Sequence, residues 1–194
     1  MLQCKLLHYT PLIYASSAIR QSHDNHHLSD SIGDIIGEKD RDLIDRVGNK
    51  LKHSSTLEFL NYIWELELST KTLLALSRHR IGISLTMRST RYTTQKNKDK
   101  HRVQDTEATR DYLARIMDIV NEAIDSGLKN DEVSLLLPQA YIYKGQIQFN
   151  ARSLQSFLKL RTKKDAHFQI RELAFSLYES LPEEHKYLFK EYIN

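Results

Sequence analysis

The clearest pattern along the chain is a run in which apolar and polar residues alternate. Between residues 60 and 68 the large apolar side chains fall on every second position, at Leu60, Tyr62, Trp64, Leu66 and Leu68. Successive side chains of a strand point to opposite faces, so this alternation predicts a strand with one buried face. Shorter runs of the same kind predict strands at residues 2–8, 83–87 and 141–149.

A helical period governs residues 106–126, and Gly127 marks the predicted end of that helix. The residues expected to face inward are Leu113, Ile116, Met117, Val120 and Ile124. A second stripe predicts a helix over residues 40–53, with a core face made of Leu43, Ile44, Val47 and Leu51. We expect further helices at residues 10–21, 69–80, 130–138 and 151–161, and a closing helical hairpin.

Short polar residues indicate where several of these helices begin. The expected caps are Thr10 before Pro11, a capping box of Ser55 and Glu58, Ser69 or Thr70, Asn130, and Asn150.

The histidine-rich residues 22–38 predict a mobile loop, and the charged residues 95–105 predict another. Helices exceed strands, and neither a repeat nor a linker interrupts them, so we predict an α+β fold in one domain over residues 1–194.

Composition narrows the class of protein further. Of 194 residues, 40% are hydrophobic and 27% are charged, which is typical of a soluble globular chain. The sequence has neither a secretion signal nor a long apolar span, so we expect a cytoplasmic protein without membrane contact. A single cysteine, Cys4, excludes an intramolecular disulfide, and we expect it to be a small buried hydrophobe.

Charge and glycine content limit how a nucleotide could be bound. The net charge is +3 and the pI is about 8.8, which is mild compared with proteins that coat nucleic acid. The six glycines form neither GxGxxG nor GxxxxGK, the two common phosphate-binding loops. Side chains must therefore hold any nucleotide.

The most informative segment is SRHRIGISLTMRSTRY at residues 77–92. Its arginines lie at a predicted junction between a helix and a strand, and arginine is suited to bidentate contacts with phosphate. A solvated helix end is the alternative, but the apolar strand that follows places Arg78 and Arg80 beside buried backbone. We therefore favour an anion-binding role.

Three ordered blocks resemble one family, the flavin-dependent thymidylate synthases. Arg78, His79, Arg80, Ser89 and Arg91 resemble its RHRx7S signature followed by arginine. HSSTLE at residues 53–58 is similar to its flavin segment, and NARSLQSFLKLR at residues 150–161 is similar to its NARSLxNFLxLR segment. The similarity covers essentially the whole chain and is greatest to the short epsilonproteobacterial-type members.

The resemblance implies a small, mostly antiparallel sheet with abundant helices, assembled as a homotetramer with sites at subunit interfaces. It implies FAD as cofactor, with dUMP, NADPH and methylenetetrahydrofolate as substrates, and no cysteine nucleophile. The residues implied for FAD are His53, Ser55, Glu58, Arg78, His79, Arg80, Ile81, Asn150, Arg152 and Ser156. Those implied for dUMP are Arg78, Ser89, Thr90, Arg91 and Arg161. Arg161 would polarise the uracil so that its C5 becomes nucleophilic, and is the implied catalytic residue.

The sequence also departs from the family. Eight residues separate Arg80 from Ser89 where the family has seven, and a bulge near Gly82–Ile83 could absorb the difference. A glutamine before RHR is replaced within LLALS, a basic dUMP contact is Ser134, and a flavin asparagine is Ser156. These changes motivate an alternative, a member of the family that binds flavin or nucleotide but has impaired catalysis.

Two other hypotheses come from local composition. The basic run RYTTQKNKDKHR at residues 91–102 would suit nucleic acid, although Asp99 and the low net charge favour a solvated loop. His23, Asp24, His26 and His27 carry metal-ligand chemistry but lack helical spacing, so we predict no metal site. We expect His167 and His185 to be surface or packing residues.

Overall fold

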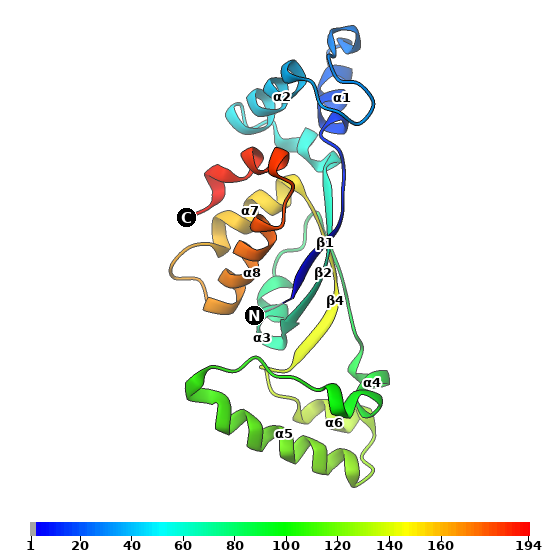
Figure 1. The fold of residues 1–194 in the computed structure, drawn as a ribbon, viewed down its shortest axis with the longest axis vertical. Coiled ribbons are helices and arrows are strands. Elements are labelled where there is room, and N and C mark those ends of the chain that lie inside the picture. Colours follow the sequence, from blue (N-terminus) through cyan, green and yellow to red (C-terminus); the bar gives the residue numbers. More distant parts are fainter. Residues whose placement is uncertain (1–2) are drawn as a thin grey trace. The chain divides into compact units, whose positions relative to one another are not determined.

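A computed structural model describes residues 3–194 and divides them into two compact units. The first unit contains Gln3, Leu66–Arg78 and Thr86–Gly145, and the second contains Cys4–Glu65, His79–Leu85 and Gln146–Asn194. Figure 1 follows the chain through its elements.

The central feature is a four-stranded sheet in the order β1-β2-β4-β3. Its strands are β1 (Cys4–Tyr9), β2 (Asn61–Ser69), β3 (Ile83–Met87) and β4 (Ile142–Asn150). Backbone hydrogen bonds join Thr10 to Asn61 at one end of the β1–β2 pair and Glu67 to Gln3 at the other, so this pair is antiparallel. Backbone hydrogen bonds from Arg88 to Lys144 and from Asn150 to Gly82 show that β3 and β4 are antiparallel as well. The predicted α+β fold with a mostly antiparallel sheet is confirmed.

The helices divide between the two units. The second unit contains α1 (Ile13–Gln21), α2 (Glu38–Ile44), α7 (Ala151–Arg161) and α8 (Phe168–Glu179), with a π-helical turn at Asp45–Lys50 and 3-10 turns at His26–Leu28, Ser54–Phe59, Glu183–Leu188 and Lys190–Tyr192. The first unit contains α3 (Thr70–Leu76), α4 (Thr90–Thr93), α5 (Arg110–Asp125) and α6 (Asn130–Leu136), with 3-10 turns at Gln95–Lys100 and Glu107–Thr109. Helix α7 packs against α8, but the hairpin expected after α7 is wrong in part, because α8 is followed by 3-10 turns instead of a second helix.

The alternation predicted for β2 is confirmed at its five alternate positions, because Leu60, Tyr62, Trp64, Leu66 and Leu68 are fully buried, while Ile63 on the other face is half-buried. Their polar groups have partners: Trp64 Nε1 donates to Ser180 Oγ at 2.8 Å, and Tyr62 Oη shares a hydrogen bond of 2.8 Å with His185 Nδ1. His185 is 1% exposed, as expected of a packing residue. The second unit is thus built on an aromatic core with satisfied polar tips.

His185 should make folding stability depend on pH. Burial lowers its pKa to about 4, with Glu184 opposing and Arg41 adding to the shift. Between about pH 6.5 and 4 the unfolded chain binds a proton that the folded chain excludes, so the free energy of unfolding falls as pH is lowered, by roughly 3 kcal/mol for a shift of this size. Urea unfolding at a series of pH values measures how steeply the free energy of unfolding changes with pH.

The matched variant for this test is His185→Asn, whose amide offers Tyr62 Oη both a donor and an acceptor but does not titrate. In this variant the free energy of unfolding should fall less steeply between pH 6.5 and 4 than in the natural protein, whatever its value at pH 7. A residual slope is expected because the pKa values of His79 and His101 are also lowered, chiefly by burial. An unchanged slope in the variant contradicts the assignment to His185.

Several expected caps are wrong. Helix α1 begins at Ile13 with Leu12 at its N-cap, while Thr10 pairs with the sheet edge and its Oγ1 accepts from Asn61 N at 3.1 Å. Ser55 and Glu58 form no capping box, because that turn is 3-10 and has His53 at its N-cap. Asn150 and Ser69 do cap their helices, through bonds from Ser153 N and Thr72 N.

The segment predicted as a loop over residues 22–38 carries defined structure. Ser29 and Ser31 each donate to Asp40 Oδ2 at 2.5 Å, and a bridge joins Ile32 to Ile35. The helix predicted for residues 40–53 instead starts at Glu38 and gives way to the π-helical turn after Ile44. Ile44 is buried but Leu51 is 57% exposed, so the predicted core stripe holds only in part.

Other boundaries move by a few residues. The helix expected to reach Arg80 ends at Leu76, and Lys129 rather than Asn130 is the N-cap of α6. In α5, Leu113 and Val120 are buried, but Ile116 is 38% exposed and faces inward less than expected. The helices within residues 3–194 are too short or too polar to cross a bilayer.

Candidate functional site

The N-cap residue of α7 is hydrogen-bonded to the segment that follows the RHR motif. Asn150 Oδ1 accepts from Ser153 N at 2.8 Å, and Asn150 N donates to Gly82 O at 2.9 Å. Gly82 has φ +65°, and a Cβ there would lie 2.3 Å from both Asn150 Nδ2 and Ser153 Oγ. Only glycine fits this close approach, so one short contact joins two of the three motifs.

The far end of α7 carries the most distinctive pair of side chains. Arg161 Nε donates to His79 Nε2 at 3.0 Å. The His79 ring also packs edge-on against Phe157, with centroids 5.0 Å apart at 69°. Burial, and then the charge of Arg161, lower the pKa of His79 to about 4. A neutral imidazole therefore lies beside a guanidinium at neutral pH.

Glu58 and Arg152 also meet, from two different motifs. Arg152 Nη1 donates to Glu58 Oε1 at 2.7 Å, and both side chains are about half exposed. Ser156 lies one turn further along α7, is exposed, and its Oγ donates to Arg152 O at 3.4 Å. Ile81 is 85% exposed, an unusual setting for an apolar residue that directly follows Arg80. The second unit thus exposes the polar side chains of Arg152 and Ser156 as well as the apolar side chain of Ile81.

His53 and Ser55 line different hollows of the second unit. His53 borders a cavity of about 430 Å³ together with Arg46 and Leu51. Ser55 borders another of about 400 Å³ together with Tyr14 and Phe59. His53 and Ser55 are therefore close in sequence but border different cavities.

Ser89, Thr90 and Arg91 lie at the start of α4 in the first unit. The guanidinium of Arg91 is held by Asp131, through Nε to Oδ1 at 2.8 Å and Nη2 to Oδ2 at 3.3 Å. Ser134 Oγ donates to the carbonyl of Asp131 at 2.6 Å. A carboxylate thus pairs with the guanidinium of Arg91, one of the residues implied for dUMP.

The RHR motif spans the boundary between the two units. Arg78 is exposed and belongs to the first unit, whereas His79 and Arg80 belong to the second. Gly82 adopts its left-handed conformation immediately before β3, where the sequence had suggested a bulge. Strand β3 then alternates between half-buried and exposed residues up to Met87.

Sequence reasoning missed Phe157 and Asp131 as neighbours of site residues. Phe157 reads as one more apolar position of α7, and its only signal is that it precedes Arg161 by one helical turn. Asp131 follows Arg91 by 40 residues, so no local pattern reveals the pair. Gly82 could have been found, because an isolated glycine before a strand often marks a close backbone approach.

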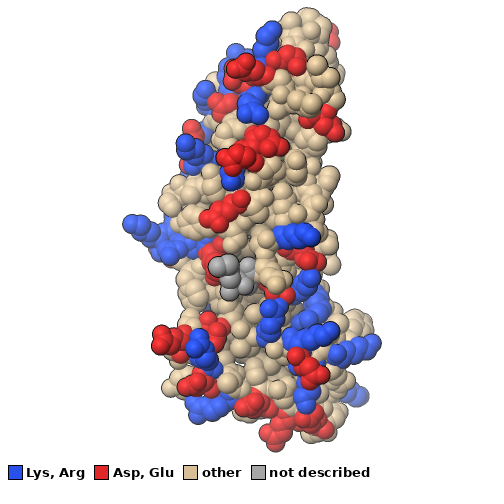
Figure 2. All heavy atoms as spheres, viewed as in Figure 1, with Lys and Arg blue, Asp and Glu red and all other residues tan. Residues whose placement is uncertain are grey.

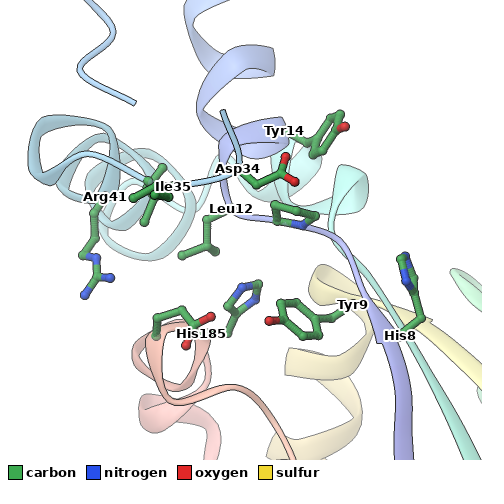
Figure 3. Close-up of a pocket in the computed structure, with 11 residues that line it drawn as sticks. His8, Tyr9, Leu12, Tyr14, Asp34, Ile35, Arg41 and His185 are labelled. Carbon is green, nitrogen blue, oxygen red and sulfur yellow. The ribbon is translucent and has the colours of Figure 1, made fainter. Parts of the chain in front are cut away.

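The cavity drawn in Figure 3 is lined by none of the predicted site residues. It has a volume of about 660 Å³ and is lined by His8, Tyr9, Pro11, Leu12, Tyr14, Asp34, Ile35, Ile36, Arg41, Glu184 and His185. Tyr9 meets His185 edge-on at its floor, with centroids 5.2 Å apart. None of the residues implied for FAD or dUMP borders this cavity, so the candidate chemistry lies elsewhere in the chain.

The two compositional hypotheses gain little from the structure. Within the basic run, Lys98 pairs with Asp125 and Arg102 pairs with Glu67. Figure 2 shows acidic side chains interspersed with basic ones on the face in view. In residues 3–194, histidine, cysteine and acidic side chains do not gather in threes as metal ligands would; His26 instead bonds to Gln21.

Comparison with known proteins is consistent with the motifs. Residues 5–185 match the family described as "Thymidylate synthase complementing protein". The chain is 40% identical over 207 residues to the flavin-dependent thymidylate synthase of Helicobacter pylori strain J99, covering 97% of this chain and 96% of that protein. It is 39% identical over 199 residues to the flavin-dependent thymidylate synthase of Wolinella succinogenes, covering 95% of each.

A solved structure agrees over the same length. Thymidylate synthase X from Helicobacter pylori, crystallised with FAD and dUMP, superposes with a TM-score of 0.90 at 34% identity and covers 99% of both chains. The motifs, the sequence relatives and the fold thus point the same way over nearly every residue, and the chain belongs to the family of flavin-dependent thymidylate synthases.

Proposed function

We propose that this chain catalyses the reductive methylation of dUMP to dTMP, with FAD as cofactor, methylenetetrahydrofolate as carbon donor and NADPH as reductant. The observation that carries the proposal is the family match over almost the whole chain, together with retention of Arg78, His79, Arg80, Arg152 and Arg161. The alternative, a member that only binds its ligands, is less favoured because these motif residues are kept.

The state of the one cysteine supports chemistry without a thiolate. Cys4 lies in β1, and burial raises the pKa of its thiol to about 11, against a smaller opposing effect of a hydrogen bond with Ser180. At neutral pH almost all of it is the protonated thiol, which is a poor nucleophile. A mechanism that needs a cysteine to attack the uracil is therefore disfavoured in this chain.

The flavin-binding set is proposed to be His53, Ser55, Glu58, Arg78, His79, Arg80, Ile81, Asn150, Arg152 and Ser156. Except for Arg78, all of them belong to the second unit. They fit FAD chemically: the half-exposed arginine at position 152 suits a diphosphate, and the exposed Ile81 suits a ring face. When bound, FAD supplies the hydride that completes the methyl group. The protein's own contribution is to bind, orient and exclude water.

The nucleotide-binding set is proposed to be Arg78, Ser89, Thr90, Arg91 and Arg161. For Arg91 to hold a phosphate, it must exchange its carboxylate partner Asp131 for the ligand. Both side chains of that pair are more than half exposed, so solvent screening makes the exchange inexpensive.

Arg161 is the proposed catalytic residue. Uracil C5 is a weak nucleophile, and negative charge develops on the ring as C5 attacks the carbon donor. A guanidinium held against the ring stabilises that charge, and it does so most strongly where water is excluded. Arg161 is half-buried in the second unit, which suits this role.

We further propose that the chain acts as one functional domain within a homotetramer, in the cytoplasm. The exposure of Ile81 supports the tetramer, because a second subunit that covers this 85% exposed apolar side chain removes it from water. A strictly monomeric holoprotein in solution would contradict this part of the proposal. Sedimentation with and without FAD decides it.

The first experiment is anaerobic oxidation of NADPH by the FAD-loaded protein, followed through the flavin absorbance with and without dUMP. We expect flavin reduction to be strongly accelerated by dUMP, and full turnover to yield dTMP when methylenetetrahydrofolate is added. Flavin that is reduced at the same rate with or without dUMP contradicts a coupled site. It would support the alternative that the chain binds its ligands without catalysis.

A further inference from the structure

We propose that His79 is a positioning residue for Arg161, holding its guanidinium by accepting a hydrogen bond from Arg161 Nε at His79 Nε2. The inference rests on the proposed function, because Arg161 is the group that is expected to act on the uracil. It gives His79 a role beyond the flavin contact that family resemblance implies. The bond is 3.0 Å long and lies within the second unit.

The chemistry of the pair fixes the state of the imidazole. Arginine has only donors, so His79 Nε2 must be unprotonated and the ring proton must lie on Nδ1. A doubly protonated ring could not accept this bond and would place two cations in contact. Burial and the Arg161 charge both favour the neutral ring.

The imidazole is itself held in place. Its ring packs edge-on against Phe157, which is fully buried and lies one helical turn before Arg161 in α7. Helix α7 thus supplies both the support behind His79 and the arginine in front of it. The backbone at Gly82, three residues after His79, is tied to the other end of the same helix by the bond from Asn150 N. Together these contacts fix where the acceptor atom lies.

Such a bond would fix the plane of the guanidinium as well as its position. An arginine side chain has several rotatable bonds, and one acceptor at Nε removes much of that freedom. Catalytic groups held in the reacting geometry are worth large rate factors, and a shift of about 1 Å can cost on the order of 100-fold. Loss of the acceptor should therefore lower the rate of methylation more than it weakens flavin binding.

The test compares His79→Gln with His79→Leu. Glutamine can place Oε1 close to the position of Nε2 and still accept from Arg161, whereas leucine fills the space against Phe157 and accepts nothing. We expect His79→Leu to lower kcat for dTMP formation by roughly 30- to 100-fold and His79→Gln to stay within about tenfold of the natural protein. Because His79 also belongs to the proposed flavin-binding set, the Kd for FAD should rise by a similar factor of less than about tenfold in both variants, and should not follow the difference in kcat between them.

A second arm asks whether the two residues act as a unit. In an Arg161→Lys background, where the Nε donor is gone, His79→Leu should lower kcat by less than a further threefold or so. Equal losses of kcat in the glutamine and leucine variants, or multiplicative losses in the double variant, would overturn the proposal. A loss of FAD affinity that parallels the loss of kcat would also overturn it, in favour of direct flavin contact.

A third measurement does not depend on activity. Nitrogen NMR of the histidine-labelled holoprotein should show one imidazole, absent in His79→Gln, with an unprotonated Nε2 whose shift moves in Arg161→Lys. A proton on Nε2 at neutral pH would refute the positioning role. If the natural protein formed no dTMP while this signal appeared as expected, the proposed function would fail and the hydrogen bond would stand.

Discussion

Replacing Arg161 by lysine should lower the turnover of dUMP by on the order of 100- to 1,000-fold while FAD remains bound. Lysine keeps a positive charge but loses the planar fork and the Nε–H that meets His79. The charge would then no longer be held against the ring on which negative charge develops. The effect should appear mainly in kcat, because an interaction that strengthens in the transition state contributes little to ground-state binding.

The measurement is steady-state dTMP formation, with FAD occupancy determined from the flavin absorbance of the same sample. Lys159→Met is the matched control, since Lys159 lies on an exposed face of α7 two residues before Arg161. It removes a cation from the same helix and should leave kcat unchanged within about twofold. Equal losses in both variants, or full activity in Arg161→Lys, would remove Arg161 from its proposed role.

Elements whose signals are local could be predicted from the sequence. The β2 pattern is visible because large apolar residues at five alternate positions, from Leu60 to Leu68, share one buried face. The cap at Asn150 is equally local, since its side chain bonds to Ser153 N three residues ahead. Because such local signals mark strands as well as helices, the α+β class could be predicted.

The predictions failed where a distant partner decides the structure. Thr10 has the sequence of a helix cap, but pairing with Asn61 draws it into the sheet edge. There a local capping preference worth about 1 kcal/mol competes with contacts that no sequence window contains. The carboxylate beside Arg91 was missed for the same reason, because Asp131 lies 40 residues further along the chain. The bond between His79 and Arg161, 82 residues apart, belongs to the same class.

The largest effect on stability should come from Asp40. Its carboxylate is fully buried and accepts from Arg20 Nε at 2.6 Å and from Ser29 and Ser31 at 2.5 Å each. Burial would raise the pKa of Asp40, but the three hydrogen bonds and the charge of Arg20 outweigh it and lower the pKa. Replacing Asp40 by alanine should cost about 3–5 kcal/mol, because it leaves the 7% exposed Arg20 as a buried cation without its carboxylate.

Urea unfolding of the FAD-free protein at one fixed concentration measures this cost, since both ligand and assembly would otherwise shift the stability. Asp42→Ala is the control, because Asp42 lies two residues further along α2 and is exposed, so its change should stay within about 0.5 kcal/mol. The double variant Arg20→Met with Asp40→Leu removes both charges and should recover much of the loss, since an apolar pair needs no compensation. A double variant no more stable than Asp40→Ala would indicate that the hydrogen bonds from Ser29 and Ser31 hold the 22–38 segment in place, rather than the ion pair.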